Sequence, residues 1–268
     1  MTETEPPSPP SPPLRIEQEY RVRFDEATPD GLAKTSALLG YLQDVAWRHS
    51  EVFGFPRAWY AERGLAWVVR AVDIGLAAAI RDGDRLWVST RILGFRRVMA
   101  RRQSELRAAD GTPAGVVVVD WAMTDGHAPV RVPGEITGIP GVERSSFEPT
   151  RVDLPPTPPG ARPLEIVPRL REMDPMGHAN NGVYLDWLDE AVTAAAGADD
   201  VRAAARRYRV EYLRAAGPGA VLRSIAWHDG TGWAWRLEDD AGDLVRGRLD
   251  PIRDQAGQPA ARADARLA

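Results

Sequence analysis

The sequence of 268 residues contains no cysteine and only four histidines. Without cysteine the chain can form neither a disulfide nor a thiolate metal site, and four scattered histidines do not have the spacing of a zinc centre. We therefore expect no metal and no cofactor. Any chemistry has to come from carboxylate, imidazole, hydroxyl and amide groups.

Long apolar runs and a strong charge of one sign are missing as well. No stretch of about 18 apolar residues is present to span a bilayer, and a net charge of −4 gives no reason to expect nucleic acid as a partner. The motifs G-x-S-x-G, H-E-x-x-H, G-x-G-x-x-G and the P-loop are absent, so serine-hydrolase, metalloprotease, dinucleotide and P-loop functions have no support. With 44% hydrophobic and 27% charged residues, the composition is typical of a globular protein.

Residues 1–13 are rich in proline, lack an apolar segment and include Glu3 and Glu5. A secretory signal needs an apolar core and a transit peptide is poor in acids, so neither fits this segment. We predict a disordered tail and a location in the cytoplasm.

From residue 14 to residue 128 the pattern predicts one strand, one long helix and an antiparallel set of strands. Apolar and charged residues alternate over 14–24, and residues 37–53 form a broad apolar helical face. Four strand-like runs follow at 65–74, 85–93, 98–107 and 113–123, with turn signals between them. Proline and glycine then crowd residues 129–163, which we predict to be a linker.

The same order restarts after the linker, in residues 164–250. The predicted elements are a strand at 164–171, a helix at 181–196, a strand at 208–213, and closing strands at 220–227, 232–237 and 244–249, with a tail at 251–268. We interpret the chain as an internal duplication. The predicted fold class is α+β, with a long central helix wrapped by an antiparallel sheet in each repeat.

The two repeats can be registered on their glycines. Placing Gly177 over Gly31 gives an offset of 146 residues and brings the apolar faces of the two helices into phase. The loops before the helices do not match chemically, because Asp174 falls on Thr28 and the two asparagines that follow fall on a lysine and a threonine. We therefore predict that the first repeat is structural and that the second carries the active site.

The stretch from Arg171 to Val192 contains the polar residues of that second loop. It reads R-E-M-D-P-M-G-H-A-N-N-G-V-Y-L-D-W-L-D-E-A-V, a tight polar loop that leads directly into an apolar helix. Free backbone N–H groups at the start of a helix lie at the positive end of its dipole. The arrangement predicts a site for an acyl carbonyl.

The segment D-P-M-G-H-A-N-N and the helix behind it resemble the signature of hotdog-fold thioesterases, of the 4-hydroxybenzoyl-CoA thioesterase type and of the acyl-ACP thioesterase family. The resemblance to the latter family covers nearly all of residues 15–250. A-L-L-G-Y-L-Q-D-V-A-W-R-H-S looks like its first helix, and E-Y-L-R-A-A-G-P-G-A-V-L looks like the strand and turn after its catalytic helix. It implies a double hotdog fold that hydrolyses fatty-acyl thioesters of acyl carrier protein without metal or cofactor. Association into a homodimer stays open.

Asp174 and His178 are the catalytic side chains that carry over from the family motif. Plant-type members place an asparagine where this chain has Met176, and a glutamate where it has Ala215. The mechanism is therefore expected to depend on Asp174. Its carboxylate could attack the thioester to give a mixed anhydride or could deprotonate water as a general base, and the sequence does not choose.

The residues that follow are predicted to support this reaction. Backbone N–H groups of Asn181, Gly182 and Val183 would bind the oxyanion, and Asn180 would cap the helix and orient the loop. His178 would hold the water or the substrate amide.

Three aromatic residues are candidates for an acyl pocket: Trp67, Tyr184 and Trp187. Aromatic residues at these spacings also form ordinary core, so both interpretations stay open. His49 lies on the apolar helix face, and we interpret it as a core histidine whose hydrogen bonds are satisfied.

Four arginines could dock an acidic carrier protein or the phosphates of coenzyme A: Arg96, Arg97, Arg101 and Arg102. A solvated strand edge explains them equally well. We consider hydrolysis of acyl-ACP first, with acyl-CoA as the alternative substrate. A hotdog hydratase uses a different motif, and a catalytically inactive acyl-binding protein is kept open by the two departures from the family motif.

Overall fold

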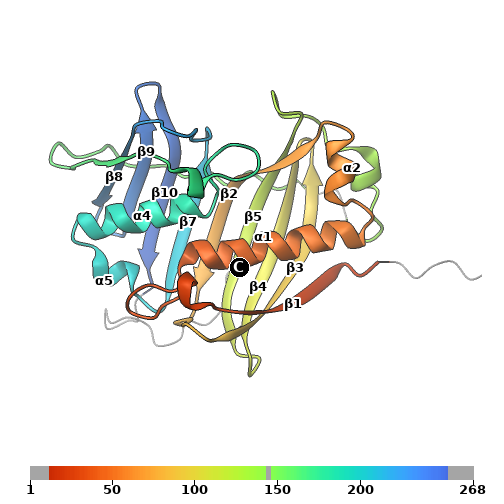
Figure 1. Ribbon diagram of the computed structural model, residues 1–268, viewed down its shortest axis with the longest axis horizontal. Helices are drawn as coiled ribbons and strands as arrows, with labels where there is room; N and C mark the ends of the chain where they lie inside the picture. The colour runs from red at the N-terminus through yellow and green to blue at the C-terminus, as the bar shows by residue number, and fades with distance from the viewer. Residues whose placement is uncertain (1–11, 143–145, 253–268) are drawn as a thin grey trace, which may run out of the picture.

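The computed structural model describes residues 12–142 and 146–252 (Figure 1). Its strands are β1 (Arg15–Arg21), β2 (Ala66–Leu76), β3 (Arg85–Arg96), β4 (Met99–Ala108), β5 (Pro113–Thr124), β6 (Leu164–Ile166), β7 (Arg206–Tyr212), β8 (Leu222–His228), β9 (Trp233–Asp239) and β10 (Gly242–Pro251). Its helices are α1 (Thr35–Val52), α2 (Arg57–Ala61), α3 (Gly134–Thr137), α4 (Val183–Ala194) and α5 (Ala198–Val201), with one-turn 3₁₀ helices η1 (Phe24–Glu26) and η2 (Leu170–Glu172). The order from β1 to β5 recurs from β6 to β10, as the duplication predicts.

The strands of both repeats form one antiparallel sheet in the order β1-β3-β4-β5-β2-β7-β10-β9-β8-β6. The repeats meet edge to edge where β2 pairs with β7, from Ala71 opposite Glu211 to Leu76 opposite Arg206. Helices α1 and α4 lie on the same face of this sheet (Figure 1). The predicted double hotdog fold is thus confirmed.

The apolar faces of the two long helices build the core. Leu38, Leu39 and Val45 of α1 and Leu185 and Leu188 of α4 are completely buried against the sheet. The predicted helix boundaries at 37–53 and 181–196 are close to the observed ones. In the described ranges no helix is long and apolar enough to cross a membrane.

The loops that lead into α1 and α4 have the same backbone geometry. The amides of Thr28 and Asp174 each donate to the carbonyl oxygen four residues later, at 2.8 Å in both loops. Gly31 and Gly177 both adopt the left-handed conformation, with φ of 76° and 79°, which glycine reaches without the steric cost of a Cβ. The offset of 146 residues therefore holds at the level of single hydrogen bonds.

Two predicted strands have different lengths in the structure. The strand predicted at 164–171 ends at Ile166, because Pro168 has no N–H to donate to the ladder and the chain then turns into η2. The strand predicted at 85–93 continues through a β-bulge to Arg96, and the hairpin turns only at Arg97, whose φ is 52°.

Among its described residues, the predicted linker at 129–163 contains the short helix α3 and otherwise no helix or strand. Asp120 of β5 accepts a hydrogen bond from the amide of Thr150 at 2.8 Å, and Glu211 of β7 accepts one from the amide of Val152 at 2.9 Å. Because Val119 faces α1 and side chains alternate along a strand, Asp120 points to the other face of the sheet. The linker therefore crosses the face that the helices leave open.

The predicted tails lie almost entirely outside the described residues. Only residues 12–13 of the first tail and residues 251–252 of the second are described. Pro13 lies next to α1, where its carbonyl oxygen is 3.0 Å from Nε2 of His49.

Candidate active site

The carboxylate of Asp174 is held by the loop in which it lies. Its Oδ1 accepts hydrogen bonds from the amides of Met176 at 2.8 Å and His178 at 3.4 Å, so the side chain folds back over the turn. Its Oδ2 accepts no hydrogen bond from any described residue. One oxygen thus fixes the orientation of the carboxylate, and the other is left to meet a ligand.

Of the three backbone amides predicted as oxyanion donors at the start of α4, two are already bound within the loop. Asn180 accepts from the amide of Gly182 at its Oδ1 and from the amide of Val183 at its carbonyl oxygen, both at 2.9 Å. Asn180 therefore orients the loop as predicted, although it acts through an Asx turn and Gly182 is the N-cap. Within the described residues, the amides of Asn181 and Tyr184 have no acceptor. They are the free donors at this helix start.

Two buried tyrosines hold the start of α4 through their hydroxyl groups. The hydroxyl of Tyr212 donates to the carbonyl oxygen of Asn181 at 2.8 Å, and the amide of Ala216 donates to the hydroxyl of Tyr184 at 2.8 Å. Burial raises the pKa of Tyr184, and the negative charge of Asp174 raises it further, while the amide of Ala216 lowers it. The field of the Asp174 carboxylate thus reaches the buried end of the loop.

The other loop residues with predicted roles are exposed. His178 is exposed, and its ring makes no hydrogen bond or ion pair with a described residue. Met176 and Ala215 stand where plant-type members of the family have an asparagine and a glutamate. Met176 is 46% exposed and Ala215 is exposed as well, so no other side chain takes the place of the asparagine or the glutamate. Of the two predicted catalytic side chains, only Asp174 is held in a defined hydrogen-bonded geometry.

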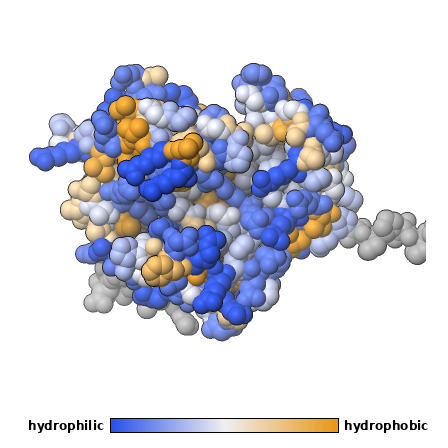
Figure 2. All heavy atoms as spheres, viewed as in Figure 1, coloured by the Kyte–Doolittle hydropathy of each residue, from blue (hydrophilic) through white to orange (hydrophobic). Residues whose placement is uncertain are grey.

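A β-bulge at Arg70 of β2 lies where the two repeats separate. The register with β5 shifts between Val69 and Ala71, and pairing with β7 starts only at Ala71. The guanidinium of Arg70 donates to the carbonyl oxygen of Tyr212 at 2.5 Å and pairs with Glu211 at 2.9 Å. Figure 2 shows the surface hollowed between the two repeats, and in Figure 1 the loop before α4 curls beside the upper part of β2. The opening between the repeats therefore lies next to the Asp174 loop.

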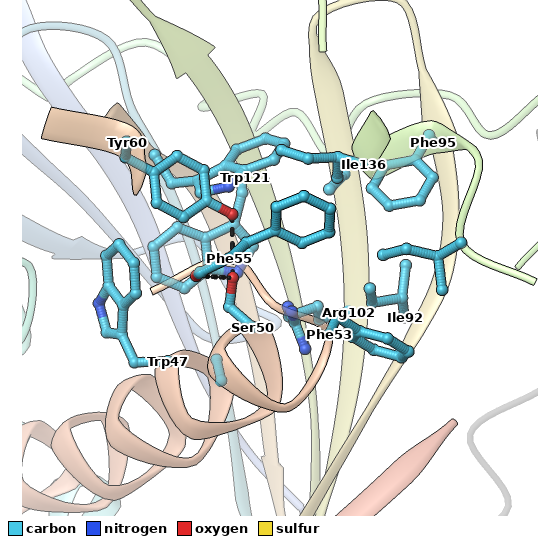
Figure 3. A pocket seen from close by; sticks show the side chains of 14 residues that line it. Trp47, Ser50, Phe53, Phe55, Tyr60, Ile92, Phe95, Arg102, Trp121 and Ile136 are labelled. Carbon is cyan, nitrogen blue, oxygen red and sulfur yellow. Dashed lines mark hydrogen bonds between the residues drawn. The ribbon is translucent and has the colours of Figure 1, made fainter. Parts of the chain in front are cut away.

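A partly open cavity with about 30 Å³ of internal space lies in the first repeat, between α1 and the sheet (Figure 3). Its walls come from the second half of α1, the α2 segment, the β3–β4 hairpin, β2, β5 and the α3 segment. The lining residues are Ala46, Trp47, Ser50, Phe53, Phe55, Tyr60, Trp67, Ile92, Phe95, Ala100, Arg102, Trp121, Ile136 and Ile139. The mostly apolar lining is that of a small-molecule site.

The three aromatic residues predicted for an acyl pocket lie in different places. Trp67 lines this cavity. Tyr184 and Trp187 are not among its lining residues; they are 2% and 3% exposed in the core of the second repeat, where their rings pack edge to face. The sequence analysis missed the remaining lining residues. The available signal was the apolar face of residues 37–53, because this face extends beyond the part of the helix that has a helical counterpart in the second repeat.

The four arginines do not form the basic surface patch that the sequence suggested. Arg96 pairs with Glu148, and Arg101 pairs with buried Asp120 at 2.6 Å, so both hold the linker. Arg102 lines the cavity. Arg97 alone stays exposed at the hairpin turn. Neighbouring residues on a strand point to opposite faces of the sheet, so these four side chains do not share one surface.

Comparison with known proteins agrees with both halves of this architecture. A model described as acyl-ACP thioesterase N-terminal domain matches residues 13–139, and one described as thioesterase superfamily matches residues 176–232. The chloroplastic palmitoyl-acyl carrier protein thioesterase of Cuphea hookeriana is 24% identical over 88% of this chain. The chain spans 62% of the length of that relative.

Two solved structures have the same fold at low sequence identity. The 12:0-ACP thioesterase from Umbellularia californica superposes with a TM-score of 0.74 at 20% identity, over 89% of this chain and 97% of that one. An acyl-ACP thioesterase from Bacteroides thetaiotaomicron also has a TM-score of 0.74, at 16% identity, over 88% of this chain and 97% of that one. The first repeat is thus similar to the N-terminal domain of acyl-ACP thioesterases, and the second is similar to the thioesterase superfamily.

Proposed function

We propose that this protein hydrolyses fatty-acyl thioesters, with acyl-ACP as the substrate, and that Asp174 performs the chemistry. The observation that carries the proposal is the position of the Asp174 carboxylate, which is anchored through one oxygen and free at the other, at the start of a helix with unpaired amides. Support comes from the match of residues 13–139 to the acyl-ACP thioesterase N-terminal domain and from the similarity to the acyl carrier protein thioesterases of Cuphea hookeriana and Umbellularia californica.

The proposed reaction needs one carboxylate and one donor for the developing oxyanion. Asp174 takes a proton from a water molecule, the water oxygen bonds to the thioester carbon, and the carbonyl oxygen becomes negative. The amide of Asn181 stabilises that oxygen at the positive end of α4. The C–S bond then breaks, the thiolate leaves, and the products are the free acid and the thiol.

A second route uses the same carboxylate as a nucleophile. Asp174 would bond directly to the carbonyl carbon and expel the thiolate, and water would then hydrolyse the mixed anhydride. Single turnover in ¹⁸O-labelled water separates the two routes. The general-base route leaves Asp174 unlabelled, whereas hydrolysis of the anhydride at its aspartyl carbonyl places ¹⁸O in the side chain.

The cavity of the first repeat is the proposed place for the acyl chain. Trp67 lines the cavity on β2, three residues before the bulge at Arg70. Arg70 contacts Tyr212, whose hydroxyl holds Asn181. The cavity and the start of α4 both lie on the face of the sheet that the helices cover, and a thioester at Asp174 would extend its chain along this face into the first repeat. The first repeat would then bind the substrate while the second performs the reaction.

The deciding experiment is thiol release from a panel of acyl-ACPs and acyl-CoAs of graded chain length. The proposal expects hydrolysis of acyl-ACP with a preferred length, because the size of the cavity limits the chain. Faster cleavage of acyl-CoA would identify acyl-CoA as the substrate in place of acyl-ACP and would leave the proposed active site unchanged. Binding of acyl groups without thiol release from either carrier would identify an inactive acyl-binding protein. This outcome stays an alternative because Met176 and Ala215 replace an asparagine and a glutamate of the family motif.

A further inference from the structure

The cavity in the first repeat has aromatic and aliphatic walls with one cationic group among them. Arg102 extends into it from β4, and its guanidinium lies among Ser50, Phe53 and Ile92 (Figure 3). A plain hydrocarbon chain would need no such group in its pocket, because burying a charge without a partner is costly. The position of Arg102 therefore points to something more than an apolar chain.

The described residues provide no counter-ion for Arg102. Within them its one side-chain hydrogen bond is with Nδ1 of His49 at 3.0 Å, and no carboxylate lies within ion-pair distance. Its sequence neighbour Arg101 differs, since it forms two hydrogen bonds with the carboxylate of Asp120 at 2.6 and 2.8 Å. Arg102 is partly buried, so its guanidinium gives up part of its contact with water and receives no ion-pair partner in return.

His49 orients Arg102 without neutralising it. Nε2 of His49 is bound to the carbonyl oxygen of Pro13 at 3.0 Å and must donate there, which leaves Nδ1 as an acceptor for Arg102. Burial lowers the pKa of His49 to about 4, and the charge of Arg102 lowers it in the same direction, so the ring is neutral. Burial also lowers the pKa of Arg102 to about 10, which still leaves the guanidinium charged at neutral pH.

The hydroxyls of Ser50 and Tyr60 in the cavity are already paired with each other, whereas the indole N–H of Trp121 has no hydrogen-bond partner among the described residues. Ser50 donates its hydroxyl to the carbonyl oxygen of Phe55 at 3.0 Å, and the hydroxyl of Tyr60 lies 2.9 Å from the Ser50 oxygen, where it can donate in turn. Arg102 carries five N–H donors, and one of its nitrogens is bound to His49. Donors that face the cavity are therefore left for a ligand.

We infer that Arg102 binds a carboxylate at the far end of the acyl group, so that the preferred substrate is the half-thioester of a dicarboxylic acid. This inference rests on the proposed function. The thioester lies at Asp174, the middle of the acyl group packs among the aromatic walls, and the terminal carboxylate meets the guanidinium as a planar, bidentate partner. A chain of the same length that ends in a methyl group leaves the cation unpaired and gains less from the cavity.

The test compares two thioesters of equal chain length on the same carrier, one ending in a carboxylate and one in a methyl group. The parent protein is expected to show a kcat/KM at least about tenfold higher for the carboxylate-ended substrate, mainly through KM. Arg102→Met should abolish or reverse the preference, and Arg102→Lys should retain part of it because the charge stays. Arg97→Met removes an exposed arginine five residues away and should leave the preference unchanged.

Each outcome has a defined meaning. Equal or faster cleavage of the methyl-ended thioester by the parent protein overturns the inference and leaves the proposed function standing. If neither thioester is cleaved, the proposed function fails, and calorimetric titration with the free dicarboxylic acid decides about Arg102. Binding by the parent protein and by Arg97→Met, with loss in Arg102→Met, supports the inference, whereas absence of binding to the parent protein overturns it. Thermal unfolding of each variant shows whether it is folded.

Discussion

The two repeats share one backbone plan and fill it differently. Helix α1 has 18 residues and α4 has 12, and the offset of 146 places the end of α4 on Arg48. The last turn of α1, with His49 and Ser50, has no helical counterpart in the second repeat. This extra turn forms one wall of the cavity in the first repeat.

The second repeat is solid where the first is hollow. Trp235 is fully buried there, with its indole N–H donated to Ser224 at 2.9 Å, and Trp187 packs nearby on α4. Its chemical groups lie outside the core, in the loop before α4. On the proposed function, the duplication separates binding of the acyl chain in the first repeat from the reaction in the second. A core with a cavity is loosely packed, whereas a rigid catalytic loop needs a tightly packed core beneath it.

The largest expected effect concerns the two matched loops. Asp174→Asn keeps the shape of the side chain and removes the charge that either route requires, so kcat should fall by about 10²–10⁴. Thr28→Ala changes the matched position of the first repeat, where the hydroxyl is buried without a partner, and should leave kcat within a few-fold of the parent. Steady-state thiol release measures both. Damage by Thr28→Ala alone would move the active site to the first repeat.

The solid and hollow cores should differ in their response to truncation. Trp235→Ala removes a completely buried side chain and should lower the free energy of unfolding by ~3–5 kcal/mol. Phe53→Ala removes a side chain that borders empty space and should lower it by about 1 kcal/mol, since fewer contacts are lost. Chemical denaturation gives both values. Equal losses would mean that the cavity is not open in solution.

Filling the two cores at one matched pair should have different consequences for substrate choice. Ala46 of α1 lines the cavity, and Val192 is its counterpart on α4. Ala46→Phe should move the preferred acyl chain to shorter lengths, with a change of about tenfold in the ratio of kcat/KM between long and short substrates. Val192→Phe should overpack the solid core, destabilise the protein by ~1–3 kcal/mol and leave the chain-length profile unchanged. A profile that moves with Val192 instead would place the chain in the second repeat.

The smallest expected effect is a dependence of stability on pH that comes from Asp189 of α4. Burial raises the pKa of Asp189 to about 7, and Arg206 opposes the shift, while the matched residue of α1 is the neutral Gln43. Because the folded pKa lies above the unfolded value, ionisation of Asp189 costs stability as pH rises from about 4 to about 7. Asp189→Asn should flatten this part of the profile by about 1–2 kcal/mol. Urea unfolding of the parent and the variant at pH 5 and pH 8 measures how much the free energy of unfolding changes between the two pH values. An equal change in both proteins would contradict the assignment of this pH dependence to Asp189.

The sequence was sufficient for features that depend on local periodicity and on turn chemistry. The apolar phase of the two helices and the glycines at positions 31 and 177 were enough to predict the duplication and its offset. The loop before α4 could be recognised as the likeness of a known motif. In these cases one short segment contains the whole physical cause.

Features that depend on packing between distant segments could not be predicted in this way. The cavity exists because the β3–β4 hairpin continues past its bulge and carries Ile92 and Phe95 over α1. The sequence left the role of the four arginines open, because it does not show that Arg101 and Arg102, which are adjacent in sequence, face opposite sides of the sheet. The free amide of Asn181 depends on which neighbouring amides Asn180 accepts from, which only the folded loop determines.

The most direct test of the division between the repeats is a crystal structure of the Asp174→Asn variant with an acyl thioester trapped in it. The account predicts that the thioester carbonyl oxygen lies about 3 Å from the amide nitrogen of Asn181 and that the acyl chain runs into the first repeat, between Ser50 of α1 and Ile92 of β3. An acyl chain inside the second repeat, or a thioester bound away from the start of α4, would contradict it.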